Sequence, residues 1–228
     1  MKFIAFLPCR AGSQRVKNKN TRKFANYELG LFELKIKDLV KVKSIDTIVV
    51  STNERKIIRY LRNKKFKKVQ IDIRPENLCT SNTTTDRLIK YVPKIISEGH
   101  VLWTHVTSPF FDNMEYEKSI NLYKKKIEQD YDSLMSVTPI KKFIWNEKKP
   151  INYDYKKIKW PFTQKIKKLY EVNSAIFINS VKNYKKLDNR VGKKPFLYEI
   201  DDYKKIDVDN LNDFKIAERA YKNLFDGK

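Results

Sequence analysis

The sequence contains few of the residues that build disulfide frameworks, zinc sites and glycine-rich turns. Among its 228 residues there are two cysteines, two histidines and five glycines. Cys9 and Cys79 are too few for a disulfide framework or a zinc site, and His100 and His105 add no metal-ligand spacing. No uncharged apolar run is long enough to span a bilayer. The short apolar start ends in a basic loop, so we expect it to be the first strand of a cytoplasmic protein without a membrane partner, and not a signal peptide.

Acidic residues are scarce relative to basic ones. The chain has 49 lysines and arginines against 27 aspartates and glutamates, a formal net charge of +22. This balance is compatible with nucleic acid, an anionic membrane surface or an anionic small substrate as a partner. The lysines are spread along the whole chain, however, and no zinc-finger, RNA-recognition or basic-zipper signature is present. We therefore expect most of the charge to be solvated surface, with function confined to one cluster, and keep a nucleic-acid-binding protein as the alternative.

Short apolar strands alternate with amphipathic helices along most of the chain. Strands are expected at 2–8, 45–52, 68–75, 100–109, 133–139, 173–180 and 195–200, and helices at 32–42, 53–64, 83–97, 115–129 and 210–225. Asn53 and Asn210 are expected to cap two of these helices, and Leu211 and Leu224 to lie on the apolar stripe of the last. The alternation predicts an α/β fold with a mostly parallel, Rossmann-like sheet.

The regular pattern breaks at about residues 140–170. This stretch is aromatic, basic and short of clean periodicity. We interpret it as an insertion within a single domain spanning residues 1–228, which covers a site or meets a partner subunit. Trp103, Trp145 and Trp160 are expected to be core or subunit-interface residues.

The connection after the first strand carries an unusual density of positive charge. Within fourteen residues it holds Arg10, Arg15, Lys17, Lys19, Arg22 and Lys23. It lacks both GxxxxGK[ST] and GxGxxG, so it is neither a Walker loop nor a dinucleotide fingerprint. It reads RxGSxRxxxKN, in which Gly12 and Ser13 would let backbone N–H groups approach an anion. Arg10, Arg15 and Lys19 would neutralise phosphates there, so a polyphosphate cradle is expected.

Two further segments place polar residues after expected strands, where ligands of open α/β sheets bind. One is "VTSP" at 106–109, and the other is "KIDVDNLND" at 205–213. Asp207 and Asp209 are two residues apart on an extended segment, so their side chains point the same way. Two carboxylates could hold Mg²⁺ on the phosphates that the basic loop binds. Together these features indicate nucleotidyl transfer.

At these residues the chain resembles the acylneuraminate cytidylyltransferases, the enzymes that make CMP-sialic acid and related CMP-nonulosonates. The loop of that family reads approximately (P/A)-R-x-G-S-K-x-x-x-x-K-N, against "PCRAGSQRVKNKN" here. Five more segments match in the same order: "IVVSTN", "IRPENL", "THVTSPF", "NSAIFI" and "IDVDNLNDFKIAE". The resemblance implies a Rossmann-like nucleotidyltransferase fold of the GT-A-like kind, an insertion that builds a homodimer, CTP as the donor and Mg²⁺ as the cofactor.

The resemblance also implies roles for individual residues. Arg10, Lys19 and Asp209 would be catalytic, and the nucleotide would be bound by Arg10, Ala11, Gly12, Ser13, Arg15, Lys19, Asn20, Arg74 and Ser81. The acceptor would be bound by His105, Thr107, Ser108, Gln164, Glu171 and Asn173, and the metal by Asp207 and Asp209.

In the implied reaction, CMP passes from CTP to an acidic nine-carbon sugar of the sialic, pseudaminic or legionaminic type, with release of pyrophosphate, for surface-glycan biosynthesis. This chain departs from the sialate pattern on the acceptor side. Thr163 and Glu171 stand where the sialate enzymes carry arginines near the sugar carboxylate, and His105 replaces a glutamine. An octulosonate, a phosphonate or a sugar phosphate therefore stays open as the acceptor.

Overall fold

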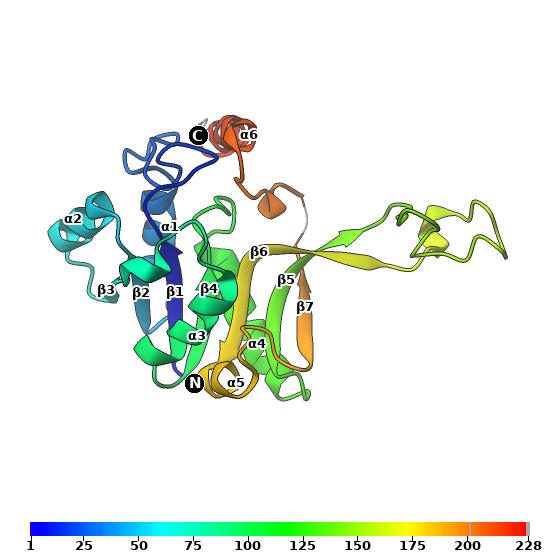
Figure 1. Cartoon of the computed structure of the whole chain (residues 1–228), viewed down its shortest axis with the longest axis horizontal. Helices are drawn as coiled ribbons and strands as arrows, with labels where there is room; N and C mark the ends of the chain where they lie inside the picture. Colours follow the sequence, from blue (N-terminus) through cyan, green and yellow to red (C-terminus); the bar gives the residue numbers. More distant parts are fainter. Residues whose placement is uncertain (201, 227–228) are drawn as a thin grey trace.

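A seven-stranded sheet runs through the part of the chain that the computed structural model describes, residues 1–200 and 202–226. The strands lie in the order β3-β2-β1-β4-β6-β5-β7 (Figure 1). Their bounds are β1 Phe3–Cys9, β2 Thr47–Thr52, β3 Val69–Ile73, β4 His100–Thr104, β5 Ser133–Ile140, β6 Leu169–Ser180 and β7 Pro195–Glu199. β1 pairs in parallel with β2 and β4, β2 with β3, and β5 with β7, whereas β6 runs antiparallel to β4 and β5. The predicted α/β fold with a mostly parallel sheet is confirmed.

Helices cover both faces of the sheet because its central strands are apolar on both sides. The helices are α1 Gly30–Lys41, α2 Arg55–Lys64, α3 Thr85–Ile95, α4 Asn113–Ile127, α5 Val181–Leu187 and α6 Leu211–Tyr221. In β1, Phe3 and Leu7 pack with α1 and α4, whereas Ile4 and Phe6 point the other way and pack with α3 and α5. None of the helices in the described ranges is long and apolar enough to cross a bilayer.

Several expected helix details differ from the structure. Asn53 does not cap α2, because the N-cap is Glu54, whose side chain accepts a hydrogen bond from the Lys56 N–H. The cap of α6 is Asn210 as expected, and it forms a reciprocal capping box with Asp213. Leu211 and Leu224, expected on the apolar stripe of this helix, are 40% and 41% exposed. α5 was not anticipated.

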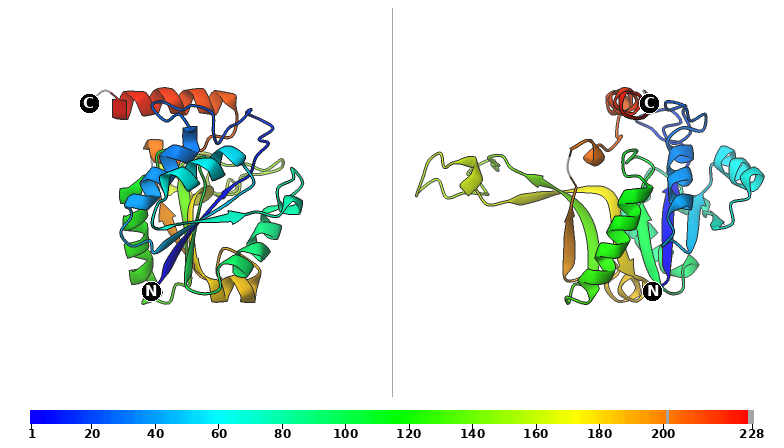
Figure 2. Two further views of the ribbon diagram at one scale, coloured as in Figure 1. Left: turned by 90° about the vertical axis from the view of Figure 1, so that its left-hand side faces the viewer. Right: turned by 180° about the vertical axis from the view of Figure 1, so that it is seen from behind.

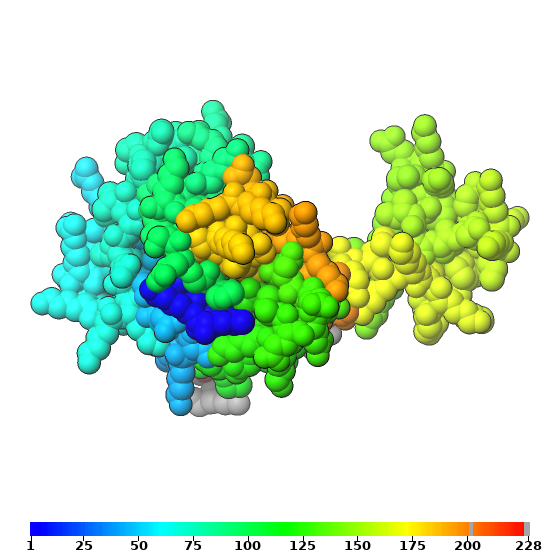
Figure 3. Space-filling view, turned by 90° about the horizontal axis from the view of Figure 1, so that it is seen from below, coloured from blue at the N-terminus to red at the C-terminus, as the bar shows by residue number. Residues whose placement is uncertain are grey.

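Residues 141–168, here called the arm, extend away from the sheet between β5 and β6 (Figures 1 and 3). The space-filling view shows the arm as a lobe joined to the body by a narrow neck (Figure 3). Of the three tryptophans, Trp103 is buried in the core, whereas Trp145 and Trp160 on the arm are 51% and 70% exposed. The arm therefore presents large apolar side chains without burying them in its own chain.

The C-terminal helix lies beside the loop that follows β1 (Figure 2). Phe24 of that loop packs edge-on against Phe214 of α6, with ring centroids 5.5 Å apart. The Ala25 N–H donates to a Glu218 carboxylate oxygen at 2.9 Å. This packing brings residues that are nearly 190 positions apart in the sequence, Lys19 and Val208, into hydrogen-bond contact.

Candidate active site

The loop after β1 is held in shape by its own backbone and by the neighbouring strand. Gly12 has a φ of +73°, a left-handed conformation that favours glycine. The Ala11 N–H donates to the Asn53 side-chain oxygen at 2.9 Å, and the Asn20 amide donates to the Arg10 carbonyl at 3.2 Å. Asn53 thus fixes the start of the loop from the carboxyl end of β2. These contacts hold the loop in one defined conformation at the carboxyl ends of β1 and β2.

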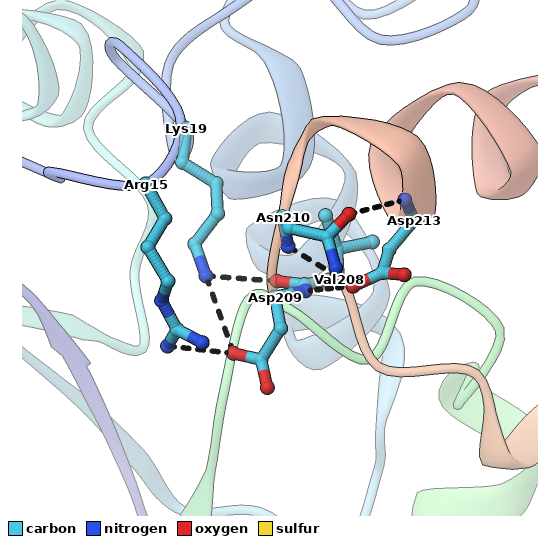
Figure 4. A network of polar contacts seen from close by, with 6 residues as sticks. All are labelled: Arg15, Lys19, Val208, Asp209, Asn210 and Asp213. Carbon is cyan, nitrogen blue, oxygen red and sulfur yellow. Dashed lines mark hydrogen bonds and ion pairs between the residues drawn. The ribbon is translucent and has the colours of Figure 1, made fainter.

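The basic loop and the C-terminal aspartates meet, as Figure 4 shows. The Lys19 ammonium donates to the Val208 carbonyl oxygen at 2.8 Å and lies 4.0 Å from the Asp209 carboxylate. Arg15 forms an ion pair with the same carboxylate at 2.8 Å. Only 13% of the Lys19 side chain is exposed, and this burial lowers the pKa of Lys19, against the opposite influence of the Asp209 carboxylate. A phosphate entering here would meet a desolvated cation, which attracts it more strongly than a hydrated one would.

A cleft of about 240 Å³ opens beside this contact. It is lined by Pro8, Arg10, Ser13, Gln14, Arg15, Val16, Lys19, Asn20, Arg74, Leu78, Thr83, Leu88, His105, Val106 and Thr107. The lining comes from the carboxyl ends of β1, β3 and β4 and from α3, which is where ligands bind in open α/β sheets. Four of the lining side chains are arginines or lysines and none is acidic. The cleft is therefore suited to a polyanion.

Asp207 provides a buried carboxylate oxygen with no protein partner. Its Oδ1 is buried and makes no hydrogen bond within residues 1–200 and 202–226. Burial chiefly raises the pKa of Asp207, a hydrogen bond from Thr107 lowers it, and the Asp209 charge raises it further. A buried, unpartnered carboxylate oxygen beside a second carboxylate has the donor chemistry that Mg²⁺ prefers. These two residues fit a magnesium ion.

The two aspartates alone would not complete the coordination of a metal ion. No group of three or more His, Cys, Asp or Glu side chains arranged to hold a metal occurs in the described part of the chain. Magnesium is usually bound by one or two carboxylates together with substrate phosphates and water. Asp207 and Asp209 match that pattern, in which the nucleotide itself completes the coordination.

Arg74 is a buried cation at the wall of the cleft. It is 3% exposed, and its guanidinium donates from Nε to the Ser51 hydroxyl at 3.0 Å and from Nη2 to the Ser51 carbonyl at 2.6 Å. Burial lowers its pKa. The contacts with β2 fix the guanidinium in place, so Arg74 can act as a rigid donor to a ligand.

A buried lysine holds the segment after β4 in place through two hydrogen bonds to its backbone. Lys35 of α1 donates to the Ser108 carbonyl at 2.8 Å and to the Phe111 carbonyl at 2.7 Å. The Thr107 carbonyl accepts from the Val208 N–H at 2.8 Å, which ties this segment to the aspartates. Thr107 lines the cleft, whereas Ser108 is 1% exposed and lies beneath it.

Besides Ser108, eight predicted site residues lie outside the set that lines the cleft: Ala11, Gly12, Ser81, Gln164, Glu171, Asn173, Asp207 and Asp209. Ala11 and Gly12 belong to the loop backbone, and Ser81 is exposed on the turn before α3. Glu171 is exposed on β6 opposite Thr138. Gln164 lies on the arm in a separate hollow with Ile140, Lys141, Thr163, Ile166 and Lys168.

Asn173 is also outside the cleft. It is 8% exposed and its amide donates to the Thr138 hydroxyl at 3.0 Å, which holds β6 to β5. The acceptor roles of Gln164, Glu171 and Asn173 thus stay predictions for a bound state.

Some residues that shape the site were not predicted from the sequence. Thr83, Leu78 and Leu88 line the cleft, and Arg190 contacts His105. Asn53 had a usable signal, a polar side chain directly after a buried strand. Nothing in the sequence pointed to Arg190, because it lies in an irregular loop outside every segment that matches the family.

The cytidylyltransferase family model matches residues 4–219. The N-acylneuraminate cytidylyltransferase of Escherichia coli O18:K1:H7 (strain RS218 / NMEC) is 24% identical over 226 residues, which cover 95% of this chain and 51% of that protein. The chain thus spans about half the length of this relative.

Two solved structures show the same fold at low identity. The CMP:2-keto-3-deoxy-manno-octonic acid synthetase complexed with CTP has a TM-score of 0.68 and 14% identity, covering 99% of this chain and 100% of that one. The 4-diphosphocytidyl-2C-methyl-D-erythritol synthase of Anaerococcus prevotii DSM 20548 has a TM-score of 0.67 and 16% identity, covering 97% and 96%. With a family model matched over nearly all of its length, the chain belongs to the cytidylyltransferase family.

Proposed function

We propose that this protein transfers CMP from CTP to a small acidic acceptor and releases pyrophosphate. The observation that carries the proposal is the contact of Lys19 with the Val208 carbonyl and Asp209 beside a cationic cleft. It brings the basic loop into contact with the segment that carries Asp207 and Asp209. The cytidylyltransferase family match supports the same activity.

The cations of the loop would neutralise the triphosphate. Arg10, Arg15 and Lys19 all line the cleft. Of the two that contact Asp209, Lys19 is more deeply buried than Arg15. An acceptor hydroxyl oxygen attacks the α-phosphorus, the bond to the β-phosphate oxygen breaks, and the hydroxyl proton is lost to solvent. Charge that builds up on the departing pyrophosphate is stabilised by preorganised donors such as Lys19.

Asp207 and Asp209 would hold magnesium on the triphosphate. When bound, the ion would supply Lewis-acid stabilisation of phosphate charge. Arg15 now pairs with Asp209, and in the loaded site it would be free to move to the nucleotide phosphates. The chain's own contribution is to keep Asp207 buried on the segment whose Val208 N–H donates to the Thr107 carbonyl.

We propose a nonulosonate of the sialic, pseudaminic or legionaminic type as the acceptor, used in the synthesis of surface glycans. The motif resemblance and the similarity to the E. coli enzyme support this class. The nucleotide half of the site would serve an octulosonate, a phosphonate or a sugar phosphate equally well, so these acceptors belong in the same test.

The proposed activity is tested by measuring pyrophosphate release from CTP and magnesium against a panel of these acceptors. We expect release with CTP and one acidic acceptor, and none with the acceptor omitted. A chain that bound oligonucleotides with steep salt dependence and without magnesium, and released no pyrophosphate, would instead be the nucleic-acid-binding protein that the net charge of +22 allows.

The arm is proposed to build a homodimer. Trp160 and Phe162 are 70% and 73% exposed, which is costly for isolated aromatic side chains and favourable once a partner covers them. The double variant Trp160→Ser/Phe162→Ser should sediment as a monomer at concentrations where the wild type is a dimer. An unchanged sedimentation coefficient would contradict this role.

A further inference from the structure

The surroundings of His105 fix which of its nitrogens carries the proton. Its Nε2 lies 2.9 Å from the Trp103 indole Nε1 and 3.4 Å from Arg190 Nη1. Indole and guanidinium nitrogens can only donate hydrogen bonds, so Nε2 must accept. The imidazole is therefore neutral and its proton is on Nδ1.

The charges that face His105 all have the same sign. Trp103 comes from β4, Arg190 from the loop between α5 and β7, and Lys19 from the loop after β1, and none of these is acidic. Burial, then the charges of Arg190 and Lys19, lower the pKa of His105 to about 3. This agrees with the neutral form that the hydrogen-bond geometry requires.

Arg190 is a desolvated cation with no acidic partner. Its guanidinium carbon lies 3.8 Å from the centroid of the Phe177 ring and 5.2 Å from that of Trp103, so it packs against two aromatic rings. Within residues 1–200 and 202–226 it takes part in no ion pair. Burial lowers its pKa. A half-buried guanidinium without a carboxylate is expensive, and a bound anion would compensate it.

The remaining donor of His105 is available to a ligand. His105 lines the cleft, and its Nδ1 makes no hydrogen bond inside the described ranges. The Nδ1–H of the imidazole is thus free to donate to a ligand in the cleft, and the Arg190 guanidinium lies on the opposite, Nε2 side of the ring. Residues 141–168 contain no arginine, and the exposed residue Glu171 on β6 is acidic, so neither supplies a guanidinium for a sugar carboxylate.

We propose that His105 binds the carboxylate of the acceptor through its Nδ1–H, and that Arg190 is the positioning residue that holds His105 in this form and makes the position selective for an anion. This assignment rests on the proposed CMP transfer. It gives His105 the role of a fixed donor and excludes it as a general base, because its only acceptor nitrogen is already occupied by Trp103 and Arg190.

Nuclear magnetic resonance of protein labelled with ¹⁵N-histidine reads the tautomer directly. The chain has two histidines, so His100 serves as an internal reference. We expect His105 in the Nδ1–H form at pH 7.5 and still neutral at pH 5.5. In Arg190→Met, the pKa of His105 should rise, because one of the two charges that lower it is removed, while burial still holds it below its ordinary value. An Nε2–H tautomer or an imidazolium in the wild type at pH 7.5 would overturn the assignment.

Steady-state kinetics test the anion preference with the intact protein. Arg190→Met and His105→Phe should raise the KM for the acceptor about tenfold or more, the loss expected for one hydrogen bond to a charged group, and leave the KM for CTP unchanged. His105→Gln should have a lower acceptor KM than His105→Phe, because the glutamine amide, like the imidazole, offers both an acceptor and a donor. The wild type should prefer the acceptor over its carboxamide analogue, and Arg190→Met should lose this preference.

Control variants separate the proposal from general damage to the fold. Lys193→Met changes an exposed cation of the same loop and should leave both KM values unchanged. If Arg190→Met is unstable to heat, Arg190→Lys serves as the second variant, because it keeps the positive charge and should keep the acceptor KM close to that of the wild type. An unchanged acceptor KM in both Arg190→Met and His105→Phe would overturn the proposal, whereas failure of the wild type to bind CTP would overturn CMP transfer itself.

Discussion

Replacement of Lys19 by methionine tests whether this side chain stabilises the charge of a triphosphate. Its ammonium lies 2.8 Å from the Val208 carbonyl oxygen and 4.0 Å from Asp209, with 13% of the side chain exposed. Methionine keeps most of the apolar stem but provides neither a charge nor a strong donor. The nucleotide would then meet a cleft that lacks its most deeply placed loop cation.

The expected loss can be estimated from the nature of the contact. Removal of one preorganised donor to transition-state charge costs about 2.7–4 kcal/mol, or about 10²- to 10³-fold in kcat. The Val208 carbonyl also loses its donor, a cost to stability of about 1–3 kcal/mol. That cost is offset by relief from burying the ammonium, since burial is the largest influence lowering the pKa of Lys19. We expect a large fall in kcat with a small change in the free energy of unfolding.

The assay is pyrophosphate release at saturating CTP and acceptor, with urea denaturation of each variant. Lys17→Met is the matched control, because Lys17 is exposed on the same loop, and it should keep the wild-type kcat. A Lys19→Met enzyme as fast as the wild type would refute the reasoning. An equal loss in both variants would show that the loop acts only through its total charge.

Three further predictions concern the metal, the cap and pH. Asp207→Asn should fold as stably as the wild type, because it removes a buried charge, but should require far more magnesium for pyrophosphate release; an unchanged magnesium dependence would contradict the metal role. Asn210→Ala should destabilise the protein by about 1 kcal/mol in urea denaturation through loss of the α6 cap, and an unchanged midpoint would contradict it. Wild-type stability should fall as the pH drops below about 6.5, because the unfolded His105 then takes up a proton that the folded one does not accept until about pH 3. His105→Gln should show a shallower decline, measured by denaturation at pH 7.5 and pH 5.

Much of the fold could be predicted because the strands are apolar on both faces and the helices are amphipathic. β1 is buried at nearly every position, as a central parallel strand must be, and such runs are recognisable in a sequence. α5 escaped notice because it is only seven residues long and carries three lysines among few apolar residues. Asn53 was misassigned because only Asn53 and Glu54 separate the end of β2 from the start of α2, and asparagine is the more usual cap of the two.

The candidate site was predictable where one segment holds several polar residues in sequence. The loop fingerprint and the aspartate pair gave Lys19 and Asp209, which the structure brings to 4.0 Å. The sequence could not show that Val208 contributes its carbonyl, since a backbone group carries no residue signature. Arg190 was equally hidden, because its relation to His105 depends on how the loop before β7 packs onto Phe177.

Hydrogen exchange of the wild-type protein with and without CTP and magnesium tests the convergence of the two segments on one nucleotide most directly. We expect the nucleotide to slow exchange at residues 10–20 and at residues 205–211 together, with residues 141–168 unaffected. Slower exchange in only one of the first two segments, or in neither, would contradict a single triphosphate site shared by the loop and the aspartates.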